Sequence, residues 1–174
     1  MAMWSVRRLN TVSEADLQQL ARVLIDCVEG GASVGFMHPL ELQRATVFWR
    51  HVADEVATGQ RALIVAEDSG GICGTVQLVL AQPDNQPHRA DLAKMLVHRR
   101  ARRHGLGAAL VRAAETTARG CGKTVLVLDA VTGGEAARLY ERLGWRRVGD
   151  IPRYALMPDG TFCSTTVFYR DLDS

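Results

Sequence analysis

The sequence predicts an α/β (α+β) fold in which helices cover both faces of a single mixed, mostly antiparallel β-sheet. Strand-like and helix-like patterns follow one another in the order β-α-α-β-β-β-α-β-α-β-β. A βαβ unit lies at the centre, over residues 90–129, with hairpin patterns on either side. The 174 residues contain no internal repeat, low-complexity tract or linker rich in Pro or Ser. We therefore expect one domain over residues 1–174.

Five elements are predicted in the first half of the chain. Apolar residues spaced three and four positions apart predict the helices, and alternation of apolar with other residues predicts the strands. Ser13, with Glu14 and Asp16 behind it, is typical of a helix start, and Gly30 is typical of a helix end. The five elements are a strand over 4–9, helices over 13–29 and 42–56, and strands over 61–67 and 72–81.

Six further elements are predicted in the second half. The continuous apolar run 124–129 is typical of a strand buried on both faces. Gly144 suits the end of a short helix, and Pro158-Asp159-Gly160 predicts the turn of a closing hairpin. The six elements are strands over 90–97, 124–129, 145–149 and 162–169, and helices over 105–119 and 135–143.

Composition excludes several classes of protein. The chain is 47% hydrophobic and 23% charged, which is typical of a globular protein rather than a disordered, collagen-like or coiled-coil one. No apolar run approaches the roughly 20 residues needed to cross a bilayer, and residues 1–8 lack the apolar core of a secretory signal. The four cysteines are far apart, which favours reduced, mostly buried thiols over a zinc site or a catalytic cysteine. We therefore expect a cytoplasmic protein without a metal.

The basic residues concentrate in one segment, 98–104. This segment holds four of the 21 Lys and Arg residues, more than the whole net charge of +2. A nucleic-acid surface would spread such residues along a face, so the pattern favours one local anion site and no nucleic-acid partner.

The same segment continues into a glycine-containing turn between a predicted strand and a predicted helix. Gly105 and Gly107 would let the backbone approach an anion closely, and the N-terminus of the helix would attract negative charge. The segment lacks the GKS/T of a Walker A loop and the third glycine of a dinucleotide fingerprint. It predicts a pyrophosphate site; the alternative is an Arg-rich turn with no ligand.

Together these motifs resemble those of the GCN5-related N-acetyltransferase (GNAT) family. Arg102, Gly105 and Gly107 fit the family motif R/Q-x-x-G-x-G/A at the start of the central helix. Residues 136–145 fit the family element A-x-x-x-Y-x-x-x-G-F/W, with Tyr140 as its tyrosine. The resemblance implies a GNAT fold over essentially the whole chain, acetyl-CoA as co-substrate, and direct acetyl transfer to an amine.

Several other segments are similar to the tabtoxin resistance branch of that family, whose substrate is an amino-acid-like β-lactam toxin. These segments are 30–37, 89–97, 128–129, 147–152, Tyr154 and 158–160. The resemblance implies a small-molecule primary amine as acceptor, with tabtoxinine-β-lactam as one candidate, no membrane partner, and a monomer or homodimer. Two alternatives stay open: a protein acetyltransferase acting on N-termini or lysines, and a CoA-binding sensor without catalysis.

The resemblance also implies roles for single residues. Tyr140 is the expected proton donor to the leaving thiolate, because a phenol with a pKa of about 10 is protonated at neutral pH; the alternative is a core tyrosine. Leu96 and Val97 are expected to offer backbone groups to the pantetheine arm, and a backbone amide near Met95 to bind the thioester oxygen. The expected cofactor-binding loop comprises Arg102, Arg103, His104, Gly105, Leu106, Gly107 and Ala108.

The acceptor side is less sharply indicated. Asp91 and Asp129 lie on or at the end of predicted strands beside the expected acetyl site. Either is a candidate base, acting directly or through water, and either is alternatively a paired strand-edge carboxylate. Phe36 and Met37, in the apolar loop 32–40, are expected to contact the acceptor unless that loop is a hydrophobic plug.

Two further positions bear on the predicted site. Tyr154 is expected to contact the acceptor from a loop after the strand 145–149. Many family members carry Asn seven residues before the tyrosine, where it contacts the pantetheine arm. This chain has Gly133 there, so that contact must be lost or replaced, with the backbone groups of Gly133 and Gly134 as the candidate replacement.

Overall fold

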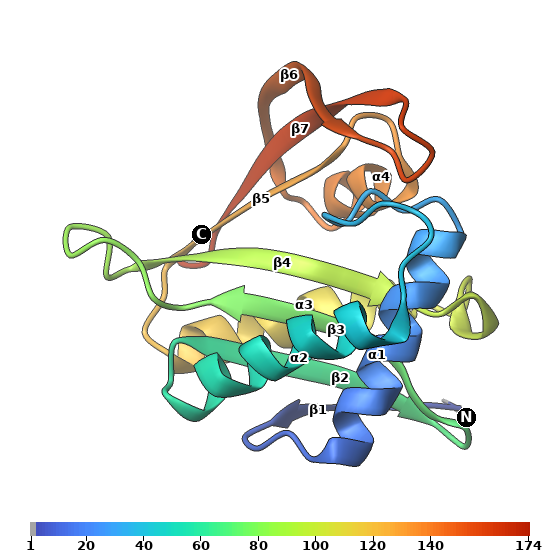
Figure 1. The fold of residues 1–174 in the computed structure, drawn as a ribbon. Helices are drawn as coiled ribbons and strands as arrows, with labels where there is room; N and C mark the ends of the chain where they lie inside the picture. The colour runs from blue at the N-terminus through green and yellow to red at the C-terminus, as the bar shows by residue number, and fades with distance from the viewer. Residues whose placement is uncertain (1–2) are drawn as a thin grey trace.

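The computed structural model describes residues 3–174 as a seven-stranded sheet with helices on both faces (Figure 1). The predicted element order is confirmed, with one added 3-10 turn at Arg99–Ala101. The strands are β1 (Ser5–Leu9), β2 (Arg61–Asp68), β3 (Gly71–Val79), β4 (Arg89–Val97), β5 (Val125–Val131), β6 (Arg146–Leu156) and β7 (Phe162–Asp171). The helices are α1 (Glu14–Glu29), α2 (Leu42–Ala57), α3 (Leu106–Gly120) and α4 (Glu135–Arg142). No helix of residues 3–174 is long and apolar enough to span a membrane.

The sheet separates two hydrophobic cores. Its strand order is β1-β2-β3-β4-β5-β7-β6, and β4 pairs with β5 in parallel while the other neighbours are antiparallel. One core lies against α3 and α4 and contains Leu110 and Phe168. The other lies against α1 and α2 and contains Leu24 and Trp49. All four of these side chains are fully buried.

Local signals explain where the helices begin and how they face the sheet. Ser13 caps α1, because its hydroxyl accepts from the backbone N–H of Asp16 and the Asp16 carboxylate accepts from the backbone N–H of Ser13. Leu42, at the start of the second predicted apolar stripe, is 48% exposed rather than buried. The inward face of α2 therefore begins at Ala45.

The prediction that strand 124–129 is buried on both faces was wrong. Leu126 and Leu128 are buried against α3 and α4, but Val127 is only partly buried and Asp129 is exposed. The reason is that α1 and α2 pack mainly on β2, β3 and β4. The second face of β5 is therefore left open beside β4.

The two central strands diverge along their length, as Figure 1 shows. The parallel ladder joins residues 89–91 to 125–127 and goes no further along the described chain. Beyond it, Lys94 and Met95 both lie opposite Val76 of β3, which makes a bulge in β4. Lys94 has φ +50° there. This divergence opens the sheet between β4 and β5.

The closing hairpin is longer than predicted. Tyr154, which was predicted to lie in a loop, is therefore part of a strand. β6 runs to Leu156 through a bulge in which residues 152–154 lie opposite Ser164. Pro152 has no N–H to donate to the ladder, and Arg153 has φ +52°, which explains why this stretch has the sequence of a loop. The hairpin reaches the α1–α2 loop, where Ser33 Oγ donates to Leu156 O over 3.1 Å.

Candidate active site

A cleft of about 1290 Å³ lies where β4 and β5 diverge. Its walls come from the α1–α2 loop, β4, the start of α3, the β5–α4 connection and the β6–β7 hairpin. A second cavity of about 290 Å³, between His38 and the turn at Pro158, contains none of the predicted catalytic or cofactor-binding residues. Ligand pockets commonly measure about 300–1,000 Å³, so the cleft between β4 and β5 has room for an extended ligand and is the candidate site.

The predicted phosphate loop forms one end of this cleft. Gly105 caps α3 in the left-handed conformation, with φ +77°, which a residue with a side chain adopts only at a cost. The first amides of α3 have no partner inside the helix and are available to an anion. All of the predicted loop residues except His104 line the cleft. Those that line it are Arg102, Arg103, Gly105, Leu106, Gly107 and Ala108.

Gly105→Ala is expected to weaken acetyl-CoA binding and to lower the free energy of unfolding by about 1–2 kcal/mol. A Cβ at this position would meet nothing within 4 Å, so the effect isolates the backbone conformation of the loop. Gly120→Ala, at the far end of the same helix and equally open, is the matched control and should be neutral or stabilising. Urea unfolding and acetyl-CoA titration measure both. A Gly105→Ala protein that matches the control would show that the left-handed cap is dispensable.

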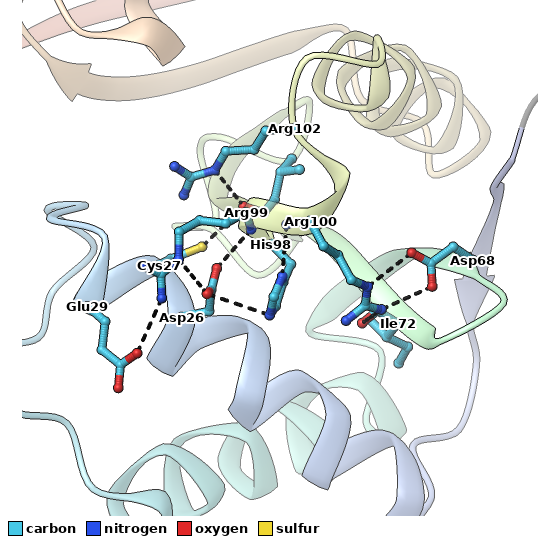
Figure 2. Close-up of polar contacts among 10 residues, drawn as sticks. Asp26, Cys27, Glu29, Asp68, Ile72, His98, Arg99, Arg100 and Arg102 are labelled. Atoms are coloured by element: carbon cyan, nitrogen blue, oxygen red, sulfur yellow. Dashed lines mark hydrogen bonds and ion pairs between the residues drawn. The ribbon is translucent and has the colours of Figure 1, made fainter.

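The basic segment before this loop is largely engaged in structural ion pairs (Figure 2). Arg99 Nε lies 2.7 Å from Asp26 Oδ1, and Arg100 Nη2 lies 3.0 Å from Asp68 Oδ1. Arg102 donates from Nε to Val97 O over 3.0 Å. Only part of this segment is therefore available to bind an anion, not the whole segment as predicted. Among its arginines, only Arg102 and the exposed Arg103 also line the cleft.

Asp26 holds this segment against the end of α1. Its carboxylate is buried and accepts from the Arg99 backbone N–H at 2.9 Å, from Arg99 Nε at 2.7 Å, and lies 3.6 Å from His98 Nε2. Burial alone would raise the pKa of Asp26, but the two hydrogen bonds from Arg99, aided by the nearby positive charges, outweigh it and lower that pKa. Asp26 is therefore a charged anchor for the strand-to-helix connection.

Asp26→Asn is expected to lower the free energy of unfolding at pH 7 by about 1–3 kcal/mol. Because the pKa of Asp26 is lowered on folding, its stabilisation is present above the unfolded value of about 4 and is lost as pH falls through the folded value. The variant should therefore lose less stability on acidification than the native protein. Urea unfolding at pH 3 to 7 measures this.

Glu14→Gln is the control for Asp26→Asn. Glu14 forms an exposed ion pair with Arg50, and such pairs contribute about 0–1 kcal/mol. An Asp26→Asn protein no less stable than this control would contradict the anchoring role.

Tyr140 lies in α4, near its C-terminal end. It lines the cleft but is only 3% exposed, and its ring packs against Trp145 and Phe168 with centroid distances of 5.4 and 6.0 Å. Trp145 is held in turn by donating from Nε1 to Glu115 Oε1 over 3.0 Å. Burial raises the pKa of the Tyr140 phenol, so the hydroxyl keeps its proton well into the alkaline range.

The two candidate bases occupy different surroundings. Asp129 lines the cleft, and its Oδ2 accepts from Thr165 Oγ1 over 2.7 Å. Asp91 does not line the cleft: it forms an ion pair with Arg89 and accepts from Gln82 Nε2 over 3.2 Å. The geometry thus favours Asp129 over Asp91 as a group that reaches the substrate.

The acceptor wall also differs from the prediction. Residues 30–35 of the α1–α2 loop line the cleft, whereas Phe36 and Met37 do not. Phe36 packs edge-on against Phe48 with centroids 5.3 Å apart, and Met37 is 42% exposed. Tyr154 does line the cleft, from the bulge of β6.

Comparison with known proteins decides the family. A model of the acetyltransferase (GNAT) domain matches residues 59–147. The chain is also 34% identical over 127 residues to an uncharacterized N-acetyltransferase in the hisH-hisA intergenic region of Azospirillum brasilense, which covers 72% of this chain and 74% of the relative. The chain belongs to the GNAT acetyltransferase family.

Solved structures share the fold of this GNAT acetyltransferase. One is yncA, a putative acetyltransferase from Salmonella typhimurium with its cofactor acetyl-CoA, at TM-score 0.79 and 19% identity over 99% of this chain and 96% of that one. Another is a ribosomal-protein-alanine N-acetyltransferase from Brucella melitensis, at TM-score 0.80 and 21% identity over 96% of this chain and 99% of that one. The protein is thus an acetyl-CoA-dependent N-acetyltransferase of the GNAT type.

The cleft of the acetyltransferase has the features that acetyl-CoA requires. The α3 amides after Gly105 suit the pyrophosphate. In the described chain, the edge of β4 that faces β5 has no strand partner from Leu92 onward, and backbone groups along it suit the amides of the pantetheine arm. The carbonyl of Val97 is already engaged, by Arg102 Nε at 3.0 Å and by Cys27 Sγ at 3.6 Å. Among residues 3–174, no three His, Cys, Asp or Glu side chains are grouped to hold a metal.

Gly133, at the position of the family asparagine, lies in a turn whose backbone groups bond to neighbouring residues of the same segment. It has φ +72°, its carbonyl accepts from Arg138 Nη1 over 2.9 Å, and the N–H of Gly134 donates to Val131 O over 3.1 Å. These two backbone groups therefore serve the turn and the start of α4. The hypothesis that they replace the asparagine contact gains no support.

One cleft residue was missed by the sequence analysis as a functional candidate. Lys94 lines the cleft on the side of α2, with Nζ 5.7 Å from the ring centroid of Phe48. Its position depends on the bulge in β4, which arises from the register with β3 and has no local sequence signal. The sequence shows only a lysine inside a strand that is otherwise mostly apolar, which does not indicate that the residue lines a cleft.

Proposed function

We propose that this GNAT acetyltransferase acetylates the primary amino group of a small molecule. The observation that carries the proposal is that a protonated, buried phenol and an exposed carboxylate line the same cleft. The phenol is Tyr140 and the carboxylate is Asp129. A proton donor and a proton acceptor are what amine acetylation needs, because the amine loses a proton and the leaving sulfur benefits from one.

The roles of the residues follow from this arrangement. Acetyl-CoA, when bound, supplies the acetyl group as a thioester. Asp129 accepts a proton from the ammonium of the acceptor, directly or through water, and its negative charge attracts that ammonium. Tyr140 holds a proton at its hydroxyl for the departing sulfur. An N–H in the β4 bulge near Met95 stabilises negative charge on the acetyl oxygen.

The shape of the acceptor side supports a small molecule over a peptide. The α1–α2 loop and the β6–β7 hairpin are bonded to one another, through Ser33 Oγ to Leu156 O at 3.1 Å and His38 N to Pro158 O at 3.2 Å. Both segments contribute to the cleft. Their contact bridges the acceptor side, whereas a protein substrate needs an open groove. Tabtoxinine-β-lactam, a compact amino acid, is the specific acceptor that the sequence resemblance suggests.

The proposal is tested by following thiol release from acetyl-CoA with a panel of acceptors. The panel contains tabtoxinine-β-lactam, ordinary amino acids, simple alkylamines, and peptides with free N-termini or lysines. Faster release with small amines, together with their acetylated masses, is the expected result. Release driven by peptides alone would make the protein a protein acetyltransferase. Acetyl-CoA binding without release for any acceptor would support a sensor.

A further inference from the structure

Lys94 is a half-buried cation of the cleft whose charge no side chain neutralises directly. Across residues 3–174 its ammonium takes part in no ion pair and no hydrogen bond, and Nζ lies over the Phe48 ring at 5.7 Å. Burial lowers the pKa of Lys94, Arg61 lowers it further, and Asp129 opposes the change. An ammonium removed from water without a partner is costly. The position is therefore suited to an anion that arrives with a ligand.

The neighbouring charges leave Lys94 as the cation available to that anion. Arg61 Nε is held by Glu55 Oε2 at 2.5 Å, and Arg61 Nη1 donates to Gln77 Oε1 over 2.7 Å. Asp129 is near enough to influence Lys94 but forms no ion pair with it in the described chain. Near Asp129, the described residues thus present Lys94 as a cation of the cleft without an ion pair.

The space around the Lys94 ammonium is also kept open. Gly35 of the α1–α2 loop lines the cleft, and a Cβ on it would lie 3.6 Å from Lys94 Nζ. The left-handed backbone of Gly35, with φ +92°, disfavours any side chain there. The Phe48 ring also contacts the ammonium, through a cation–π interaction. The ammonium therefore lies beside Gly35, in the part of the α1–α2 loop that lines the cleft.

We propose that Lys94 binds the carboxylate of the acceptor, so that the acceptor is a zwitterionic amino acid whose amino group lies at Asp129. The inference rests on the proposed function, since it concerns the acceptor of that same reaction. An acceptor with both charges satisfies Lys94 and Asp129 together, and an amine without a carboxylate satisfies only Asp129. Lys94 is thus a specificity-determining residue rather than a proton-transfer group.

The test compares amino acids with the amines that lack only the carboxylate, such as L-leucine with 3-methylbutylamine and L-phenylalanine with phenethylamine. A hydrogen bond between charged groups corresponds to a preference on the order of 10- to 100-fold. The native protein should show that preference in kcat/KM, Lys94→Gln should lose it, and Lys94→Arg should restore part of it. Arg44→Gln is the control, because Arg44 is an exposed cation near Phe36 that does not line the cleft.

Lys94→Asn covers the case in which glutamine weakens folding, because asparagine tolerates the left-handed backbone at this position. Loss of the preference in Lys94→Gln and Lys94→Asn, measured as the ratio of kcat/KM for each amino acid to that for its plain amine, supports the inference. Equal use of amino acids and plain amines by the native protein overturns it, as does a preference that survives both substitutions.

A binding measurement separates this inference from the proposed function. Calorimetry with the same amino acids and amines, in the presence of CoA instead of acetyl-CoA, requires no turnover. Amino acids that bind in preference to amines and depend on Lys94, without being acetylated, would defeat the proposed function and leave the inference standing. No preference for the amino acids in binding or in turnover would defeat the inference.

Discussion

Tyr140→Phe is expected to lower kcat by about 10²- to 10⁴-fold, the range for loss of a positioned general acid. The ring fills the same space between Trp145 and Phe168, so folding and acetyl-CoA affinity should be nearly unchanged. The loss would come from the missing hydroxyl alone. Steady-state rates of thiol release and a separate acetyl-CoA titration measure the two quantities.

The same residue makes a prediction about pH. Because burial raises the pKa of Tyr140, kcat should show no decline from phenol ionisation up to about pH 10, the unperturbed value.

Tyr169→Phe is the control for Tyr140→Phe, because Tyr169 accepts a hydrogen bond from Arg146 over 3.4 Å and does not line the cleft. Equal losses of turnover and affinity in Tyr140→Phe, or full activity, would remove Tyr140 as the acid.

Asp129→Asn is expected to lower kcat/KM for the amine by about 10²- to 10⁴-fold, because it removes both a base and the charge that attracts the ammonium. The amide oxygen can still accept from Thr165, so the fold should persist. Asp91→Asn is the matched substitution on the neighbouring strand. Since Asp91 is paired with Arg89 outside the cleft, it should retain near-native kcat/KM.

This pair of variants answers the question that the sequence left open between the two carboxylates. A large loss in Asp91→Asn with little loss in Asp129→Asn would transfer the role to Asp91. Little loss in both would mean that the amine is deprotonated in solution before it binds. The ratio of native to variant kcat/KM, measured for both variants at one pH, distinguishes these cases.

Much of the phosphate-binding half of the site could be predicted because its signals are local. Gly105 and Gly107 mark a turn and a close approach within one short segment, and the structure shows the left-handed cap at Gly105 and only 3.1 Å between Leu139 and a Cβ placed on Gly107. The capping pair Ser13 and Asp16 is equally local. Such features depend on backbone geometry over a few residues, which the sequence encodes directly.

The acceptor half depends on contacts between distant segments. The Lys94 position is set by the register of β4 on β3, and Tyr154 enters the cleft through a bulge opposite Ser164. The partners of Arg99 and Arg100, Asp26 and Asp68, lie far away in the sequence. No periodic pattern encodes these pairings. The sequence therefore predicts an anion site over the whole basic segment, although Arg99 and Arg100 join elements of the fold.

The central claim is that amine acetylation in the β4–β5 cleft depends on the Tyr140 hydroxyl. The most direct test follows thiol release from saturating acetyl-CoA in the native protein and in Tyr140→Phe, with and without amino acid acceptors. We expect acceptor-dependent release in the native protein and almost none in a variant that still binds acetyl-CoA. Native rates in the variant, or no acceleration by any amine in the native protein, would contradict the account.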